Sequence, residues 1–233
     1  MGKKKTIRTP FFETGVKNYI YGDAVLEYAQ VVDKAAEKYD IDVLFISPYT
    51  DIRRIAKSTK NLIILAPYMD TLRPGRGIAD VLPEAVKAAG AQGVVLNHCE
   101  RPMTLNAIEK TIERANELDM LSFACADSIS EAKAISQFHP DIINPEPTEL
   151  IGSTEASDMS YVVETLRVIK DIFPDILVEQ AAGITNGKQV YDFIMAGNDG
   201  AGSASGILLS EDPFAMVDEM IFNVKKAKKD LKN

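Results

Sequence analysis

The chain has 233 residues, of which 46% are hydrophobic, and its 34 acidic and 26 basic side chains give a net charge of −8 at pH 7. This composition is typical of a soluble globular protein, and the length is sufficient for a large core. The excess of acid argues against sequence-independent nucleic-acid binding, which needs a basic surface. The lysine-rich clusters at residues 3–5 and 225–232 lie at the two termini and are interpreted as solvated ends.

Cysteine and histidine are scarce, with two of each. Cys99 and Cys125 lie outside any CxxC motif and cannot form a disulfide framework. So few nitrogen and sulfur ligands argue against a zinc site built from His and Cys, and we expect no metal. The apolar runs are far shorter than the ~18 residues of a membrane span, and the N-terminus has no hydrophobic signal region. We therefore expect no membrane association and a cytoplasmic location.

Short apolar runs, which predict strands, alternate with longer amphipathic segments, which predict helices. In chain order, the predicted strands are residues 7–13, 43–47, 62–66, 93–96, 121–124, 142–144, 176–179 and 200–203. The predicted helices are residues 23–39, 81–89, 105–118, 130–137, 161–172, 186–195 and 213–231. Residues 43–46 and 62–65 are apolar throughout, as in parallel strands that are covered on both faces.

Eight strand–helix units of about 29 residues each account for the whole length. No linker or charge block interrupts them, so we expect one domain spanning residues 1–233. The pattern predicts a (β/α)8 barrel of the α/β class, with a doubly wound open sheet as the alternative. In either fold, functional residues are expected where strands end and loops begin.

Polar or ionisable side chains follow three of the predicted strands directly. After the sixth strand, Glu146 precedes a stiff Pro147 and a segment that ends at Gly152, which indicates a base at the root of a lid. After the first strand, Lys17 places an ammonium group near the same face. The fourth strand is followed by Asn97, His98, Cys99, Glu100 and Arg101. The alternative interpretations are a structural histidine, a surface acid and a surface lysine.

Two further loops have the composition of anion-binding cradles. Residues 181–184 follow the seventh strand, residues 202–206 follow the eighth, and both consist largely of Ala, Gly and Ser. Small residues let backbone N–H groups approach phosphate oxygens, and this pair of loops is the usual phosphate site of the barrel. Small residues also occur in plain tight turns, which is the alternative for each loop taken alone.

Taken together, these residues resemble triosephosphate isomerase, particularly its short archaeal-type branch. Residues 96–101 (Leu-Asn-His-Cys-Glu-Arg) are similar to its (G/N)-H-S-E-R motif, and Glu146-Pro147 with residues 150–152 are similar to its base and lid. Supporting matches are Lys17 in the N-x-K motif, residues 81–85 and residues 182–184. The resemblance extends from Lys17 to about Pro213. It implies a barrel that interconverts dihydroxyacetone phosphate and glyceraldehyde 3-phosphate through an enediolate, a step of glycolysis and gluconeogenesis, without metal or organic cofactor.

The resemblance also implies a role for each matching residue. Glu146 would move the proton between adjacent carbons, His98 would polarise the carbonyl, Lys17 would stabilise the developing charge, and Glu100 would hold Lys17 in place. Asn97, Cys99 and Arg101 would support the site. The positions that match the family's substrate and phosphate contacts, besides Lys17, are Gly15, Gly152, Ser153, Gly183, Ala204 and Ser205.

Several positions depart from the family pattern. Gly15 stands where the family has a substrate-contacting Asn, Cys99 replaces a Ser, and Thr154 replaces a lid Gly. The third loop differs at residues 67–68 and 76–80. These departures leave two alternatives open: a paralogue that isomerises another short ketose phosphate, and a phosphate-binding barrel without turnover. The resemblance further implies a small phosphorylated sugar as substrate and a homodimer or homotetramer.

Overall fold

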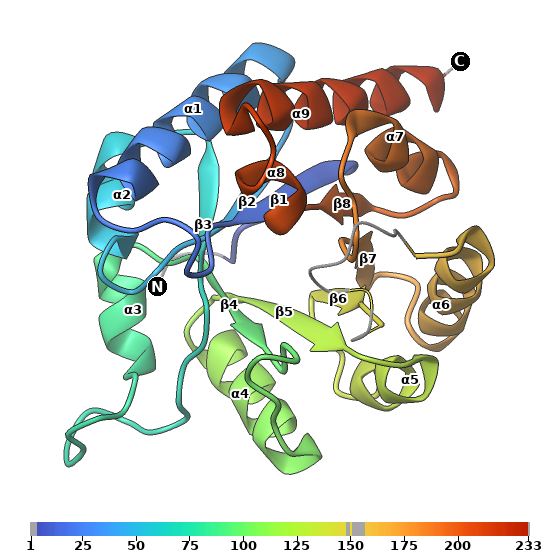
Figure 1. Ribbon diagram of the computed structural model, residues 1–233. Coiled ribbons are helices and arrows are strands. Elements are labelled where there is room, and N and C mark those ends of the chain that lie inside the picture. The colour runs from blue at the N-terminus through green and yellow to red at the C-terminus, as the bar shows by residue number, and fades with distance from the viewer. Residues whose placement is uncertain (1–3, 148–149, 151–156, 233) are drawn as a thin grey trace.

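The computed structural model describes residues 4–147, 150 and 157–232. Eight parallel strands pair in chain order and close into a barrel, with helices around it (Figure 1). The strands are β1 Phe11–Gly15, β2 Val43–Ile46, β3 Leu62–Ala66, β4 Gly93–Leu96, β5 Leu121–Ala126, β6 Ile142–Pro145, β7 Leu177–Gln180 and β8 Gly200–Gly202. The predicted (β/α)8 barrel is confirmed, and the open sheet is excluded.

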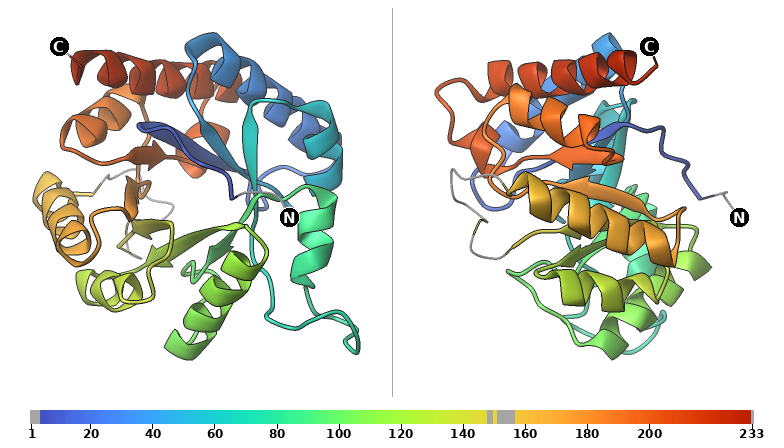
Figure 2. Two further views of the ribbon diagram at one scale, coloured as in Figure 1. Left: turned by 180° about the vertical axis from the view of Figure 1, so that it is seen from behind. Right: turned by 90° about the vertical axis from the view of Figure 1, so that its right-hand side faces the viewer.

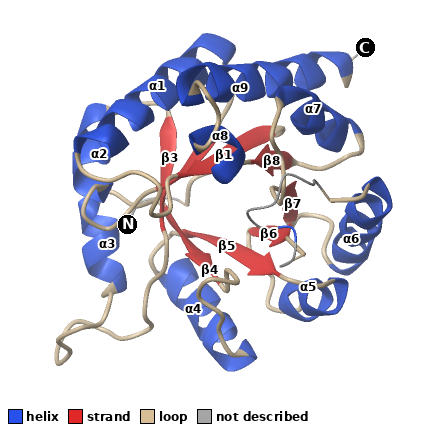
Figure 3. Cartoon of the chain, in the orientation of Figure 1, coloured by secondary structure: helices blue, strands red, loops and turns tan. Residues whose placement is uncertain are grey.

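The helices form an outer ring around the strands (Figure 3). They are α1 Asp23–Tyr39, α2 Ile52–Ser58, α3 Pro83–Ala89, α4 Leu105–Glu117, α5 Ile129–Ser136, α6 Met159–Ile172, α7 Gly187–Met195, α8 Ser205–Leu208 and α9 Pro213–Asp230. The C-terminal helix α9 packs against both α7 and α1, which closes the ring (Figure 1). No helix of the described residues is long and apolar enough to cross a membrane.

Side chains alternate between the two faces of each strand, so the hydrophobic core has two parts, one inside the barrel and one between the strands and the helices. In β2, Leu44 packs inside the barrel, whereas Val43 and Phe45 pack against the helices. In β3, Ile63 and Leu65 face inward in the same way. Successive side chains of a strand point to opposite faces, so each strand contributes to both parts of the core.

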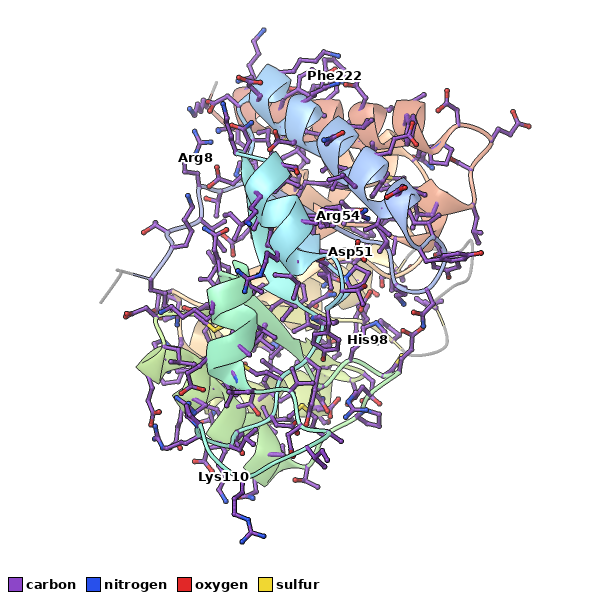
Figure 4. All side chains as sticks on the ribbon, turned by 90° about the vertical axis from the view of Figure 1, so that its left-hand side faces the viewer. Arg8, Asp51, Arg54, His98, Lys110 and Phe222 are labelled. Carbon is purple, nitrogen blue, oxygen red and sulfur yellow. The ribbon has the colours of Figure 1, made fainter. Side chains whose placement is uncertain are left out.

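The structure corrects the prediction at two places. The first strand begins at Phe11 rather than at residue 7, because Arg8 is engaged outside the barrel: its backbone N–H donates to Asp42 Oδ2 at 2.8 Å. Helix α2 was not predicted, since its seven residues contain only two buried apolar side chains, Ile52 and Ile55. Arg54 ties this short helix to its surroundings through Asp51 at 2.7 Å and Asp23 at 2.6 Å (Figure 4).

The functional end of the barrel lies opposite the N-terminal segment. That segment enters β1 at the amino ends of the strands (Figure 2, right). The loops that carry the predicted site residues leave from the carboxyl ends, as the rule for parallel α/β proteins requires.

Candidate active site

A cavity of about 630 Å³ opens at the carboxyl ends of the strands, and residues from all eight strand ends line it. Among the predicted site residues, those that line it are Gly15, Lys17, His98, Glu100, Arg101, Glu146, Gly183, Ala204 and Ser205. Asn97 and Cys99 belong to the same turn but are not part of the lining. Gly152 and Ser153, like Thr154, lie outside the described residues. The fold thus brings together predicted site residues that are up to 190 positions apart in the sequence, from Gly15 to Ser205.

Glu146 follows β6 directly and is held by its backbone, whose N–H donates to Ala126 O at 2.8 Å. Its side chain reaches the cavity, yet the residue is only 8% exposed. Burial disfavours the charged form and raises the pKa of Glu146 to about 7, although Lys17 and a hydrogen bond from Asn144 oppose the rise. A carboxylate with this pKa can take up and release a proton near neutral pH.

His98 is held as a neutral imidazole. The backbone N–H of Glu100 donates to His98 Nδ1 at 3.1 Å, so Nδ1 acts as the acceptor and the ring proton lies on Nε2. Burial lowers the pKa of His98, and the nearby Lys17 lowers it further, against the opposing charge of Glu100. The side chain can therefore donate a hydrogen bond from Nε2 without carrying a positive charge.

Lys17 lines the cavity, and its positive charge acts on both Glu146 and His98. Its backbone adopts the left-handed conformation, with φ of 43°, which an L-residue other than Gly or Asn rarely adopts. Its Nζ lies 3.3 Å from Glu100 Oε1, on a carboxylate that is more than half exposed and therefore screened by solvent. Strained backbone of this kind is characteristic of functional sites.

Gly15 occupies a crowded position on the inner surface of β1. A Cβ built there would lie 3.0 Å from Ile46 Cβ and 3.4 Å from Ile46 O. An Asn at this position would require Ile46 to shift. The departure of Gly15 from the family pattern is therefore matched by its neighbour on β2.

The two predicted cradle loops lie against each other. Ser203 Oγ donates to Ile184 O at 2.7 Å, and a Cβ at Gly206 would overlap the same carbonyl. Gly183 has a φ of 69°, which requires the freedom of a glycine. The structure thus places Gly183, Ala204 and Ser205 in adjacent loops that line the cavity.

Asn97 braces the turn that carries His98. Its Nδ2 donates to Cys125 O at 3.1 Å and to Glu131 Oε1 at 2.9 Å, and its Oδ1 accepts from the N–H of Met103 at 2.8 Å. Its φ of 58° is one that Asn tolerates better than most residues. Cys99 Sγ lies 3.9 Å from His98 Nδ1, behind the ring.

Replacing Asn97 is expected to destabilise the fold. Asn97→Ala removes three hydrogen bonds and places Ala at positive φ, so we expect the free energy of unfolding to fall by about 2–3 kcal/mol. Asn97→Gly loses the same bonds but relieves the backbone, and it should be milder by about 1 kcal/mol. Urea unfolding of both variants measures the difference; equal losses would contradict the backbone part of this account.

Arg101 is an exposed residue of the cavity lining. Its guanidinium stacks over the ring of Tyr68, 4.3 Å from the centroid. The Tyr68 hydroxyl donates to Asp70 Oδ1 at 2.8 Å, and Tyr49 donates to Tyr68 O at 3.0 Å. Arg101 therefore joins the fourth loop to the altered third loop.

The sequence patterns did not predict several buried polar groups on the strands in and around the cavity. Glu13, Asn144 and Glu179 lie at positions that face the barrel interior, whereas Gln180 faces the helices and donates to Thr165 Oγ1 of α6 at 3.1 Å. Acids inside the apolar runs of β1 and β7 were a signal that could have found two of them, because a charged residue is rarely buried without a function or partner.

The fold and this site define a (β/α)8 barrel enzyme whose buried carboxylate and neutral imidazole suit acid–base chemistry. The chain belongs to the triosephosphate isomerase family: the family model described as Triosephosphate isomerase matches residues 14–219. It is 34% identical over 210 residues to a triosephosphate isomerase of Methanobacterium bryantii, covering 88% of this chain and 92% of the relative. It is 32% identical over 209 residues to one of Sulfurisphaera tokodaii, covering 89% and 91%.

Proposed function

We propose that this chain is an isomerase that interconverts dihydroxyacetone phosphate and glyceraldehyde 3-phosphate by proton transfer. Membership of the family and the consistent names of its archaeal relatives support this function and do not favour the alternatives. The observation that carries the proposal is the buried Glu146, which shares one cavity with His98 and Lys17 and has a pKa of about 7.

The three side chains divide the chemistry between them. Glu146 removes the proton from the carbon beside the carbonyl and returns it to the neighbouring carbon, so it is unchanged after each turnover. His98 donates from Nε2 to the substrate oxygen on which negative charge develops. Lys17 stabilises the same charge and the phosphate group, and Glu100 accepts from Lys17 to hold it there.

The phosphate would lie against the wall formed by Gly183, Ala204 and Ser205. Backbone N–H groups and small residues permit the close approach that a phosphate requires. Binding the phosphate at this wall would hold the reacting carbons toward Glu146 and His98, which face the same cavity. The predicted phosphate contacts at Gly152 and Ser153 belong to the part of the chain that the structure does not describe.

A coupled assay tests the proposal. We expect turnover of dihydroxyacetone phosphate and a much lower rate with a four-carbon ketose phosphate. Saturable binding of both ligands without turnover would show a binding protein instead, and a preference for the four-carbon substrate would show a paralogue.

The pH profile is expected to report Glu146. Because the base must be ionised, kcat/KM should rise with pH and reach half of its plateau at about pH 7, the pKa of Glu146 in the free enzyme. Glu146→Asp keeps a carboxylate but shortens its reach, so the profile should persist at a lower rate. If kcat/KM instead reached half of its plateau at about pH 4.5, the ordinary pKa of a glutamate, the assignment of the pH profile to the buried Glu146 would be contradicted.

We also propose that the protein self-associates as a homodimer or homotetramer. The segment between β3 and α3 projects from the barrel (Figure 1), and Ile78 within it is fully exposed. An exposed aliphatic side chain on a projecting loop is typical of a contact with another subunit. Light scattering gives the molar mass that tests this. The cytoplasmic location stays a prediction from the sequence.

A further inference from the structure

Two carboxyl groups meet inside the barrel, where one of them, that of Glu13, lines the cavity. Glu13 on β1 is 5% exposed and Glu179 on β7 is fully buried. They meet beside Gly202 of β8: a Cβ built there would lie 2.3 Å from Glu179 Oε1 and 2.4 Å from Glu13 Oε2. The missing side chain at position 202 therefore provides the space that both carboxyl groups occupy.

The carboxyl groups of Glu13 and Glu179 have few polar neighbours other than each other. Neither oxygen of Glu179 has a hydrogen-bond partner among the described protein groups, and Gly202 supplies no side chain. An ionised carboxylate in this position would be both desolvated and unpaired, which is strongly unfavourable. A protonated carboxyl group is neutral, and it can donate to the oxygen beside it. Glu13 Oε2 is the oxygen that shares its space.

The surrounding charges favour the same state. The groups that face the pair are Glu146 after β6, Cys125 on β5 and Lys17 after β1, with the buried Tyr28 of α1 behind. Burial raises the pKa of Glu13 to about 8, with the charge of Glu146 adding to the rise and Lys17 opposing it. Burial, together with the charges of Glu13 and Glu146, raises the pKa of Glu179 well above its usual range.

The raised pKa values set the order in which Glu146 and Glu13 lose their protons. The pKa of Glu146 is about 7 and that of Glu13 about 8, so Glu146 loses its proton first, and between these two values most of the base is charged while most of Glu13 keeps its proton. Within the described residues, no group of three or more His, Cys, Asp or Glu side chains is placed to hold a metal ion. The occupant that suits the pair is a proton rather than a metal cation.

We propose that Glu13 is a positioning residue for the isomerisation. With Glu179 it forms a buried carboxyl pair that stays protonated through the cycle, so that, of these three buried acids, Glu146 alone exchanges a proton. The inference rests on the proposed function. The pair gains and loses no proton in a turnover. Its neutrality keeps a second negative charge away from both the ionised base and the anionic substrate, whose repulsion would oppose binding and enolisation.

The pH profile tests the role of Glu13. In the parent protein, ionisation of Glu13 adds a negative charge beside the substrate, so kcat/KM should fall on the alkaline side with a midpoint at about pH 8. Glu13→Gln has the same shape and cannot ionise, and it should lose this alkaline limb while keeping the acid limb of Glu146. Glu179→Gln, the matched variant of the other member, leaves Glu13 in place and should retain the alkaline limb.

A purely structural role for Glu13 would change the melting temperature of Glu13→Gln without moving the pH profile. An alkaline limb that persists in Glu13→Gln, in a variant whose circular dichroism is native, overturns the proposal. Loss of the limb in Glu179→Gln but not in Glu13→Gln does so too.

A second measurement does not depend on turnover. Infrared difference spectra from about pH 6 to about pH 10 follow the C=O band of protonated carboxyl groups, which ordinary glutamates have lost by then. The parent protein should lose two such bands, one with a midpoint at about pH 7 from Glu146 and one at about pH 8 from Glu13, and Glu13→Gln should lack only the second. The same changes in both proteins, or no protonated carboxyl group at neutral pH, overturn the inference. If the bands behave as expected in a protein that isomerises nothing, the pair stands and the proposed function fails.

Discussion

Glu146→Gln is expected to lower kcat by about 10²–10⁴-fold, the range that a positioned general base contributes. The amide fills the same space but cannot accept the proton from carbon. Glu146 lies in the wall of the cavity and is almost fully buried, whereas Glu100, another acid of the lining, is more than half exposed and bonded to Lys17. The coupled assay with dihydroxyacetone phosphate measures the loss.

The same variant is expected to be more stable than the parent at pH 8. The folded pKa of Glu146 is about 7 against an ordinary value of 4.5, so the folded protein holds this proton more tightly than the unfolded chain does. The stability contributed by the carboxyl group is therefore lost as pH rises from about 4.5 to about 7. Glu146→Gln has no carboxyl group to ionise, so its free energy of unfolding should not show this loss. The difference from the parent protein should be about 3 kcal/mol at pH 8 and should disappear below pH 4.5.

Glu164→Gln is the matched control, since it removes one carboxylate from the exposed surface of α6. It should leave both kcat and the pH dependence of stability close to those of the parent. A Glu146→Gln variant that is active, or one that is less stable than the parent at pH 8, would contradict the role and the burial assigned to this side chain.

Lys17→Met is expected to lower kcat/KM by about 10²–10³-fold, the loss observed when one stabilising donor is removed from a developing oxyanion. The chain carries a net charge of −8, so an anionic substrate needs a local positive site, and Lys17 provides it. Methionine keeps the length and loses the charge. Both KM and kcat should change, because the charge acts on the phosphate and on the enediolate.

The variant should also shift the pH profile. Lys17 lowers the pKa of Glu146, so its removal should move the acid limb of kcat/KM to higher pH. Lys34→Met removes one charge from the exposed face of α1 and serves as the control. Equal losses in the two variants would show that only the overall charge matters, and an unmoved acid limb in Lys17→Met would contradict the electrostatic effect of Lys17 on Glu146.

The barrel could be predicted because its signals are local. Residues 43–46 and 62–66 are short apolar runs, and they form β2 and β3 almost as predicted. The first strand was placed too early because residues 7–10 carry an extended, partly apolar pattern, although Arg8 is bound to Asp42 outside the barrel. Helix α2 depends on the contacts of Arg54 and of two isoleucines, which no pattern in seven residues reveals.

The sequence could predict which residues form the site but not their protonation states. The strand-end rule predicts that His98, Glu146 and Lys17 lie at the same end of the barrel, and all three line the cavity there. The neutral state of His98 depends on one backbone N–H of Glu100, and the raised pKa of Glu146 depends on burial. Both are products of packing in three dimensions.

The acids inside the barrel show even more clearly that local sequence patterns do not reveal contacts made by three-dimensional packing. Glu13 lies two positions after Phe11, on the face of β1 that points inward, and alternation alone would assign an apolar side chain to it. What makes the acid tolerable is Gly202, which is 189 positions away in the sequence and pairs with it across the β1–β8 seam. Only the closed barrel brings the acid and its space together.

The most direct test of the central claim is the isomerisation of dihydroxyacetone phosphate in deuterium oxide, with the product examined by NMR. If Glu146 carries the proton between the carbons, it exchanges with solvent while the enediolate exists, and deuterium should appear at C2 of glyceraldehyde 3-phosphate. Glu146→Gln should form this product at least about 10²-fold more slowly. Labelled product from Glu146→Gln at the rate of the parent protein would contradict proton transfer by Glu146.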